Sequence, residues 1–430
     1  MNSQQSAPSP KVVDDEVVLI SVFGVDQPGI VSLITRILSG FNATILDIGQ
    51  AVIHQNLNLG VLVALSSRID KAALEQEMTA AIESKQNRIK FEPINHESYA
   101  QWVQQQGKPR HIVTLLARHI EAEHIASVTD VAFKHGLSFD RITRLSGRVP
   151  LADLSSQTKS SVEFSARGRA ANLADLRADF MKLASEFDID IAVQEDNLYR
   201  RNRRLVCFDM DSTLIEAEVI DELAKKAGVG EQVAAITEAA MSGEIDFNES
   251  FSRRMALLEG LDESTLSSIA QNLKLTEGAE KLFINLKELG YKTAILSGGF
   301  DYFARFLQKK LGVDYVYANQ LDIVEGKVTG KVIGAVVNGE RKAQLLKKIA
   351  DKENISLEQV IAVGDGANDL PMLSIAGLGI AFRAKPLVKA SAKQSISQLG
   401  LDAILYLMGL SDRETAKLLD LKAKLPVSYS

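Results

Sequence analysis

Four short apolar runs in the second half of the chain constrain its fold more than any other feature of the sequence. Residues 205–208, 292–296, 360–363 and 378–382 each end near a polar or glycine-rich turn, and helical patterns lie between them. This alternation predicts an α/β domain with a doubly wound, mostly parallel sheet. Because such sheets bind ligands beyond the carboxyl ends of their strands, we expect the functional residues in these turns.

The α/β domain is expected to cover residues 204–430, and one long segment within it differs from the rest. Residues from about 216 to about 280 have a helical pattern and lack an obvious central strand. Because this segment lies between the first two strands, it predicts an inserted helical cap.

The first half of the chain carries a different pattern, which occurs twice. Strand and helix patterns in the order β-α-β-β-α-β fill residues 17–92 and again residues 110–196. This order predicts two small α+β domains of the ferredoxin-like type in tandem. We expect residues 1–16 to form a disordered tail.

Charge and composition argue against several classes of protein. The formal net charge of −6 disfavours a general nucleic-acid binder, which needs a basic face. The sequence has no uninterrupted apolar run of membrane length and no apolar signal core near its start, so we expect a cytoplasmic protein without a membrane partner. The single cysteine, Cys207, allows no intramolecular disulfide and agrees with a reducing compartment.

The chemistry of the second half must proceed without imidazole groups, because all six histidines lie before residue 136. Four polar clusters in this half follow the strands or lie between them, and each alone has an ordinary structural explanation. They are residues 209–213 ("DMDST"), residues 297–299 ("SGG"), Lys342 and residues 364–369 ("GDGAND"). Their occurrence together, at strand ends and helix starts, favours one common site.

The residue types of these clusters suit phosphoryl transfer. Asp209 and Asp365 can hold a hard cation such as Mg²⁺, together with a backbone carbonyl and water. Ser297 and the glycine amides that follow it can cradle a phosphate oxygen, and Lys342 supplies a compact positive charge. Asp209 can then attack phosphorus, because metal and lysine offset its repulsion from the phosphate dianion. Asp211 can protonate the leaving oxygen and later deprotonate the water that cleaves the aspartyl-phosphate.

Taken together, the four motifs resemble those of the haloacid-dehalogenase-like phosphohydrolases. The cap segments "DMDSTLIEAEVIDELAKKAG" and "MSGEIDFNESFSRRMALLEG" are similar to those of the phosphoserine phosphatases within that superfamily. The similarity covers about residues 205–408. It implies Mg²⁺-dependent hydrolysis of O-phospho-L-serine to L-serine and phosphate through an aspartyl-phosphate, which is the last step of serine biosynthesis.

The resemblance also implies a role for each matching residue. Asp209 matches the nucleophile and Asp211 the acid and base, and the metal ligands would be Asp209, the Asp211 backbone carbonyl and Asp365. Asp369 matches a carboxylate that supports the metal site. The implied substrate contacts are Glu218, Met241, Phe247, Arg254, Ser297, Gly298, Lys342 and Asn368.

The cap residues also make sense from the chemistry of a phosphorylated amino acid. Its ammonium and carboxylate groups call for a fixed acid and a fixed arginine, and arginine binds a carboxylate through two parallel hydrogen bonds. Glu218 and Arg254 can supply these groups, and Met241 and Phe247 an apolar wall. The alternative is that both charges lie on solvated helix surfaces, and Arg253 competes with Arg254 for the same role.

The first small domain, with its "GVDQPGIV" segment, resembles an ACT domain, a module that senses small molecules. Gly24 and Gly29 allow a loop to approach a ligand closely, and Asp26 could meet an ammonium group. Because this loop pattern is joined to a catalytic half expected to act on phosphoserine, we predict L-serine as an effector. Pairing of edge strands favours a homodimer through this half. The second domain has "ARHIEAEHIASV" at the corresponding place and lacks both glycines, so we expect the fold without the ligand site.

Two alternatives to this function are kept. The chain could be a regulatory protein that senses an amino acid and uses its second half for binding. It could also be a related phosphatase for another small phosphate ester, such as phosphohomoserine or phosphothreonine, because one methyl or methylene group changes only the shape of a pocket. The complete set of nucleophile, proton carrier, phosphate grip and metal pair favours an enzyme.

Overall fold

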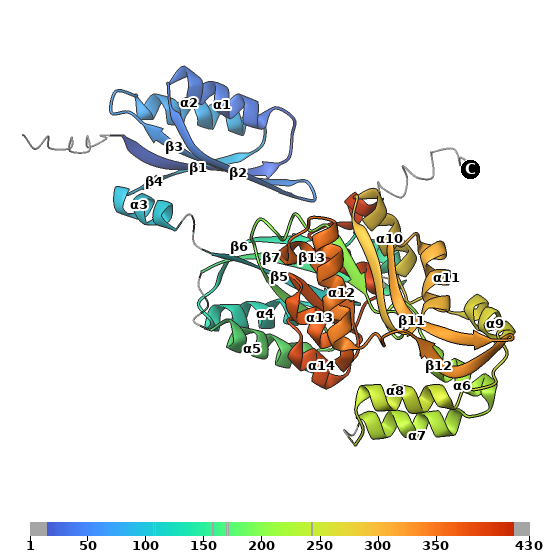
Figure 1. Cartoon of the computed structure of the whole chain (residues 1–430). Coiled ribbons are helices and arrows are strands. Elements are labelled where there is room, and N and C mark those ends of the chain that lie inside the picture. The colour runs from blue at the N-terminus through green and yellow to red at the C-terminus, as the bar shows by residue number, and fades with distance from the viewer. Residues whose placement is uncertain are drawn as a thin grey trace, which may run out of the picture. The chain divides into compact units, whose positions relative to one another are not determined.

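The computed structural model describes residues 15–105, 107, 109–156, 159–168, 170, 172–241 and 244–416, without the side chains of residues 154–156 and 241. The chain divides into two compact units between residues 108 and 109 (Figure 1). Of the predicted disordered tail, residues 1–14 lie outside the described residues. A membrane crossing has no candidate among the helices of the described residues, since none is both long and apolar enough.

The first unit is a four-stranded antiparallel sheet in the order β2-β3-β1-β4, with α1 and α2 on one of its faces (Figure 1). Its elements are β1 (Glu16–Val25), α1 (Ile30–Gly40), β2 (Thr44–Ile53), β3 (Asn56–Leu65), α2 (Lys71–Glu83), β4 (Arg88–Ile94) and a further helix, α3 (His96–Gln104). Alternate residues of β1, such as Ile20 and Val22, are buried under the helices because side chains alternate between the faces of a strand. Asp70 begins α2 by accepting a hydrogen bond from the backbone N–H of Ala73.

The second unit contains another sheet of the same kind, in the order β6-β7-β5-β8. Its elements are β5 (Arg110–Ala117), α4 (Ala122–Lys134), β6 (Ser138–Arg144), β7 (Ser160–Arg167), α5 (Leu173–Glu186) and β8 (Asp190–Glu195). In contrast to β1, strands β5 and β7 are buried on both faces. The reason is that the face of the sheet away from α4 and α5 packs against the α/β domain, with Leu116 of β5 and Ala192 of the neighbouring β8 in that domain's core.

The α/β domain is built on a seven-stranded sheet in the order β12-β11-β10-β9-β13-β14-β15. The strands are β9 (Leu205–Phe208), β10 (Lys292–Phe300), β11 (Tyr315–Val324), β12 (Lys327–Ile333), β13 (Val360–Gly364), β14 (Leu378–Phe382) and β15 (Gln394–Ile396). All neighbours pair in parallel except β11 and β12, which pair antiparallel. The predicted fold class is therefore confirmed: two ferredoxin-like domains are followed in the chain by a doubly wound and mostly parallel sheet.

Helices cover both faces of this sheet. The helices after the cap are α10 (Ala279–Glu288), α11 (Asp301–Leu311), α12 (Gly339–Lys352), α13 (Leu370–Ile375), α14 (Pro386–Ser391) and α15 (Ile404–Leu407). In the central strand β9, Val206 and Phe208 point into the core with α10 and α11, whereas Leu205 and Cys207 point into the core with α12 and α13. Both faces of β9 are thus apolar, as a central parallel strand requires.

The inserted segment forms a helical cap of α6 (Val219–Ala227), α7 (Gly230–Met241), α8 (Phe247–Ala256) and α9 (Ser264–Asn272) (Figure 1). The chain enters and leaves the cap through two short segments that lie side by side, because Ile215 and Leu275 form an antiparallel bridge. The cap also touches the sheet at β12, where the backbone N–H of Gly260 donates to the carbonyl oxygen of Val328 at 2.8 Å.

Candidate active site

The four sequence clusters meet at the carboxyl ends of the three central strands. Asp209 directly follows β9, Ser297 lies in β10, and Asp365 directly follows β13. Since β10, β9 and β13 are neighbours and parallel, these residues lie at one edge of the sheet. Lys342 reaches the same place from the first turn of α12.

A buried lysine joins two of the carboxylates. The Nζ of Lys342 lies 2.8 Å from Oδ1 of Asp209 and 2.7 Å from Oδ1 of Asp369, and its side chain is completely buried. Burial alone would lower the pKa of Lys342, but the two carboxylates outweigh it and raise this pKa. The pKa of Asp209 is raised mainly by burial and secondly by the charge of Asp369.

Three carboxylates form a group that can hold a metal ion. One oxygen from each of Asp209, Asp365 and Asp369 lies within 4.8 Å of the others. The Oδ2 of Asp369 accepts hydrogen bonds from the backbone N–H groups of Asp365 at 3.1 Å and Gly366 at 3.0 Å, and Thr213 donates its hydroxyl to Oδ1 of Asp365 at 3.1 Å. Burial, and next the charge of Asp369, raise the pKa of Asp365 to about 7. A hard divalent cation would relieve this crowding of acids.

The second acid of the "DMDST" motif lies between the sheet and the cap. The Oδ1 of Asp211 accepts the backbone N–H of Val219, the first residue of α6, at 3.0 Å. Ser212 has a positive φ of 53° and donates its hydroxyl to Oε1 of Glu218 at 2.7 Å. Burial, and next the charge of Glu218, raise the pKa of Asp211 to about 8, so this carboxyl holds a proton at neutral pH.

The Ser-Gly-Gly turn is packed tightly against these acids. The backbone N–H of Gly299 donates to Oγ of Ser297 at 2.9 Å. A Cβ atom at Gly299 would lie only 2.3 Å from Oδ2 of Asp211, so any larger residue at this position must displace that carboxylate. A Cβ atom at Gly298 would lie 3.5 Å from Cζ of Phe247 and 4.0 Å from Nδ2 of Asn368. The cap residue Phe247 therefore lies directly over the turn.

The two arginines of α8 have different surroundings. Arg253 is 56% exposed and pairs with Glu249 one turn earlier. Arg254 is more buried, and this burial lowers its pKa, while the charges of Glu218, Asp221 and Asp211 oppose that shift. Arg254 thus lies near the acids of the site, whereas Arg253 faces solvent. Residue 241 ends α7, but the side chain of Met241 lies outside the described residues.

Asn319, a buried residue of β11, also supports the turn and was not predicted from the sequence. Its Nδ2 donates to the carbonyl oxygen of Gly298 at 2.7 Å, and its Oδ1 accepts the backbone N–H of Val337 at 2.9 Å. It therefore ties the Ser-Gly-Gly turn to the segment that precedes α12. A lone asparagine in an unpredicted strand gave no signal of this role in the sequence.

The predicted ligand loop of the first unit has a backbone that favours glycine. Gly24 and Gly29 have φ values of 147° and 92°, and a Cβ atom at Gly24 would lie 1.9 Å from Oδ1 of Asn87. Asp26 lies in the same connection, and its backbone N–H donates to the carbonyl oxygen of Gln55.

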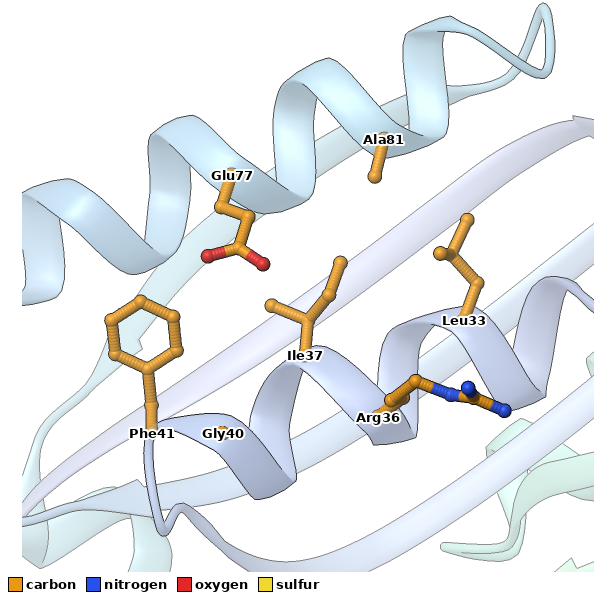
Figure 2. Close-up of a pocket in the computed structure, with 7 residues that line it drawn as sticks. All are labelled: Leu33, Arg36, Ile37, Gly40, Phe41, Glu77 and Ala81. Carbon is orange, nitrogen blue, oxygen red and sulfur yellow. The ribbon is translucent and has the colours of Figure 1, made fainter.

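A groove of about 500 Å³ lies elsewhere on this unit, between α1 and α2. In Figure 2 the carboxylate of Glu77 points across it towards Ile37 and Phe41, whereas Arg36 points away. The groove is lined by Leu33, Arg36, Ile37, Gly40, Phe41, Glu77 and Ala81. None of the three loop residues lines this groove.

Comparisons with known proteins identify the class that this fold and site define. A family model described as haloacid dehalogenase-like hydrolase matches residues 203–377, and one described as ACT domain matches residues 16–92. A haloacid dehalogenase family hydrolase from Salmonella enterica has 29% sequence identity and a TM-score of 0.60, and the match covers 69% of this chain and 98% of that one. Hydrolases of this class use a divalent metal, which agrees with the acid cluster.

Curated relatives narrow the assignment. A phosphoserine phosphatase from Streptomyces coelicolor is 37% identical over 401 residues, which is 93% of this chain and 94% of the relative. One from Mycobacterium tuberculosis is 38% identical over 404 residues, with coverage of 92% and 94%. The unliganded crystal structure of a probable phosphoserine phosphatase from Vibrio cholerae has 31% identity and a TM-score of 0.55, covering 73% of this chain and 89% of that one. The chain belongs to the phosphoserine phosphatase family.

Proposed function

We propose that this protein hydrolyses O-phospho-L-serine to L-serine and phosphate, as the last step of serine biosynthesis. The observation that carries the proposal is the buried Lys342, which bridges the carboxylates of Asp209 and Asp369 beside the Ser-Gly-Gly turn. A phosphoryl group needs a nucleophile, a cation and hydrogen-bond donors at one point, and this arrangement supplies them.

We assign Mg²⁺ as the metal, held by Asp209, Asp365 and the backbone carbonyl of Asp211. Three carboxylates within 4.8 Å of one another are hard oxygen donors, which fit this ion. When bound, it neutralises charge on the phosphoryl oxygens. Asp369 supports the group, since one of its oxygens meets Lys342 and the other accepts two backbone N–H groups.

The residues of the chain then share two chemical steps. Asp209 attacks phosphorus with a carboxylate oxygen, and the bond from phosphorus to the serine oxygen breaks. Asp211 donates its proton to that leaving oxygen, for which its raised pKa suits it. The deprotonated Asp211 next takes a proton from water, and the water oxygen attacks phosphorus. The bond between phosphorus and the Asp209 oxygen breaks, so phosphate is released and the carboxylate of Asp209 is regenerated. Ser297 and Lys342 hold the phosphoryl oxygens in both steps.

Residues of the cap recognise the serine part of the substrate. We assign Glu218 to the ammonium group and Arg254 to the carboxylate, because both lie near Asp211. Phe247 and Met241 are assigned to the apolar wall, Gly298 to the phosphate turn, and Asn368 to a substrate contact.

The first unit is assigned a sensing role. We propose that L-serine binds at the loop of Gly24, Asp26 and Gly29 and modulates the activity. The unpaired edge strand β2 carries exposed Ile45 and Ile48, which supports a homodimer through this unit. The buried cysteine and the absence of a membrane-crossing helix among the described residues are compatible with the cytoplasm, where we place the protein.

The test is phosphate release from phosphoserine, phosphothreonine and phosphohomoserine, each with Mg²⁺ and with EDTA. We expect release from phosphoserine with Mg²⁺ only, and none from Asp209→Asn. A higher kcat/KM for phosphothreonine or phosphohomoserine would mean that this ester, and not phosphoserine, is the substrate. No phosphate release from any of the three esters would favour the regulatory alternative. For the effector, L-serine should change the activity of the parent but not that of Asp26→Ala.

A further inference from the structure

The second small domain contacts Glu277, which directly follows the second of the two segments through which the chain enters and leaves the cap. These segments, residues 214–216 and 274–276, are called the cap hinge. The backbone N–H of Glu216 donates to the carbonyl oxygen of Lys274 at 3.0 Å, and that of Thr276 donates to the carbonyl oxygen of Leu214 at 3.0 Å. Any movement of the cap relative to the sheet must deform these segments, because they carry its covalent connections.

Glu277, the residue after the cap hinge, is held on several sides. Arg118 of the second small domain approaches it with both terminal nitrogens, at 2.8 Å from Oε1 and 2.7 Å from Oε2. Arg383, which follows β14, donates to Oε2 at 2.9 Å, and the backbone N–H of Leu401 donates to the carbonyl oxygen of Glu277 at 2.7 Å. The two-pronged contact with Arg118 fixes the orientation of the carboxylate as well as its position.

A second cation from the same domain acts next to this point. The Nζ of Lys159 lies 2.6 Å from Oδ2 of Asp402, which also pairs with Lys281 at 3.3 Å. Asp402 is packed against Gly278, where a Cβ atom would lie 2.4 Å from its Oδ1. The second small domain thus holds the two residues that follow the cap hinge, Glu277 directly through Arg118 and Gly278 indirectly through Lys159 and Asp402.

Arg118 lies at the place in its domain that corresponds to the predicted ligand loop of the first unit. It opens the connection between β5 and α4, residues 118–121, which corresponds to residues 26–29 between β1 and α1 in the first unit. In the first unit this connection belongs to the predicted ligand loop with Gly24 and Gly29. The second domain has neither glycine at the corresponding place, and its connection contacts the α/β domain instead.

We propose that Arg118 is a positioning residue that couples the second small domain to the cap hinge and keeps the cap over the Ser-Gly-Gly turn. The cap is closed in this structure, because Phe247 lies 3.5 Å from where a Cβ atom of Gly298 would be. Arg118 and Glu277 are 38% and 44% exposed, so their pairing adds little to global stability. The pairing fixes the orientation of Glu277 next to the hinge, and its consequence for substrate binding rests on the proposed phosphatase function.

The first measurement is independent of activity. Hydrogen exchange of the hinge amides, such as those of Glu216 and Thr276, is followed in the full chain for the parent, Arg118→Ala and Arg110→Ala. Arg110 is a matched control, since it begins the same strand, is 51% exposed and lies 2.8 Å from Asp140 away from the hinge. We expect two- to five-fold faster exchange at the hinge in Arg118→Ala, the range of one exposed ion pair, and no change in Arg110→Ala. Equal exchange in all three proteins would overturn the proposal.

The second measurement separates positioning from a structural role. With phosphoserine and Mg²⁺, Arg118→Ala should raise KM two- to five-fold at an unchanged melting temperature. Arg118→Lys should give a KM between those of the parent and Arg118→Ala, because lysine lacks the planar fork of arginine. A fall in kcat at constant KM, with a lower melting temperature, would mean a structural role and refute the coupling. A parent without phosphatase activity would refute the proposed function alone, and the exchange result would still decide the coupling.

Discussion

Replacing Gly299 by alanine tests the placement of the proton carrier without removing any functional group. Gly299 lies in β10 with extended backbone, so alanine causes no backbone strain. The new Cβ atom would lie 2.3 Å from Oδ2 of Asp211, 2.8 Å from Cε of Met210 and 3.1 Å from Oγ of Ser297. Since ordinary contact begins at 3.4 Å, the carboxylate must move by about 1.1 Å, whereas the Ser297 hydroxyl needs to move by only about 0.3 Å. Asp211 can yield by rotating its side chain, which moves its Oδ1 away from the backbone N–H of Val219.

A displacement of this size should be costly for catalysis and mild for folding. A misplacement of about 1 Å in a reacting group costs about 10²-fold in rate, and a general acid contributes about 10²- to 10⁴-fold in total. We therefore expect kcat for phosphoserine to fall by about 10²-fold in Gly299→Ala, whereas the melting temperature should fall by only a few degrees.

The assay is phosphate release at saturating phosphoserine with Mg²⁺, with thermal unfolding measured in parallel. Gly230→Ala is the control, because a Cβ atom there would have its nearest neighbour 3.9 Å away at Cγ of Lys225. A kcat of Gly299→Ala within threefold of the parent would show that Asp211 does not carry the proton from this position. An equal loss in Gly230→Ala would also refute the reasoning.

Three further predictions concern the charges of the site. Burial raises the pKa of Asp365 to about 7, so between about pH 4 and pH 7 the folded protein keeps a proton that the unfolded chain has lost, and stability in EDTA falls as the pH rises. Asp365→Asn removes this term, so its gain in melting temperature over the parent should grow across that interval; a constant difference would contradict the assignment. Lys342→Met leaves the two carboxylates that it bridges without their cation, and we expect a loss of about 3–5 kcal/mol in unfolding free energy without metal, together with a fall in kcat of at least about 10²-fold. Arg254→Ala should raise KM for phosphoserine about tenfold or more, whereas Arg253→Ala should leave it unchanged; the reverse pattern would give the carboxylate contact to Arg253.

Much of the fold could be predicted, because burial in each element leaves a local pattern. The four strands predicted in the second half are β9, the start of β10, β13 and β14. Strands β11, β12 and β15 were not predicted from the sequence. Strand β15 has only three residues, and β11 and β12 interrupt their apolar residues with polar ones such as Asn319 and Asp322. Strands at and next to the edges of a sheet, such as these, are specified by their neighbours more than by their own pattern.

The site could be predicted to the level of its motifs but not of its pairings. Asp209, Asp365 and Lys342 were expected at one place, since turns after parallel strands share an edge. That Lys342 also meets Asp369, and that Asp211 lies against Gly299, depends on side-chain directions that no sequence pattern records.

The sequence by itself determined which chemistry is available, because the identity and order of the motifs fix the functional groups and because strand periodicity fixes where they lie in the fold. The tertiary structure alone decided which charges meet. Asn319 reaches the Ser-Gly-Gly turn, and Arg118 reaches Glu277, across long distances in sequence. The physical reason is that local patterns report whether a side chain is buried, whereas the partner of a buried or clamped charge is set by the packing of elements that are distant in the chain.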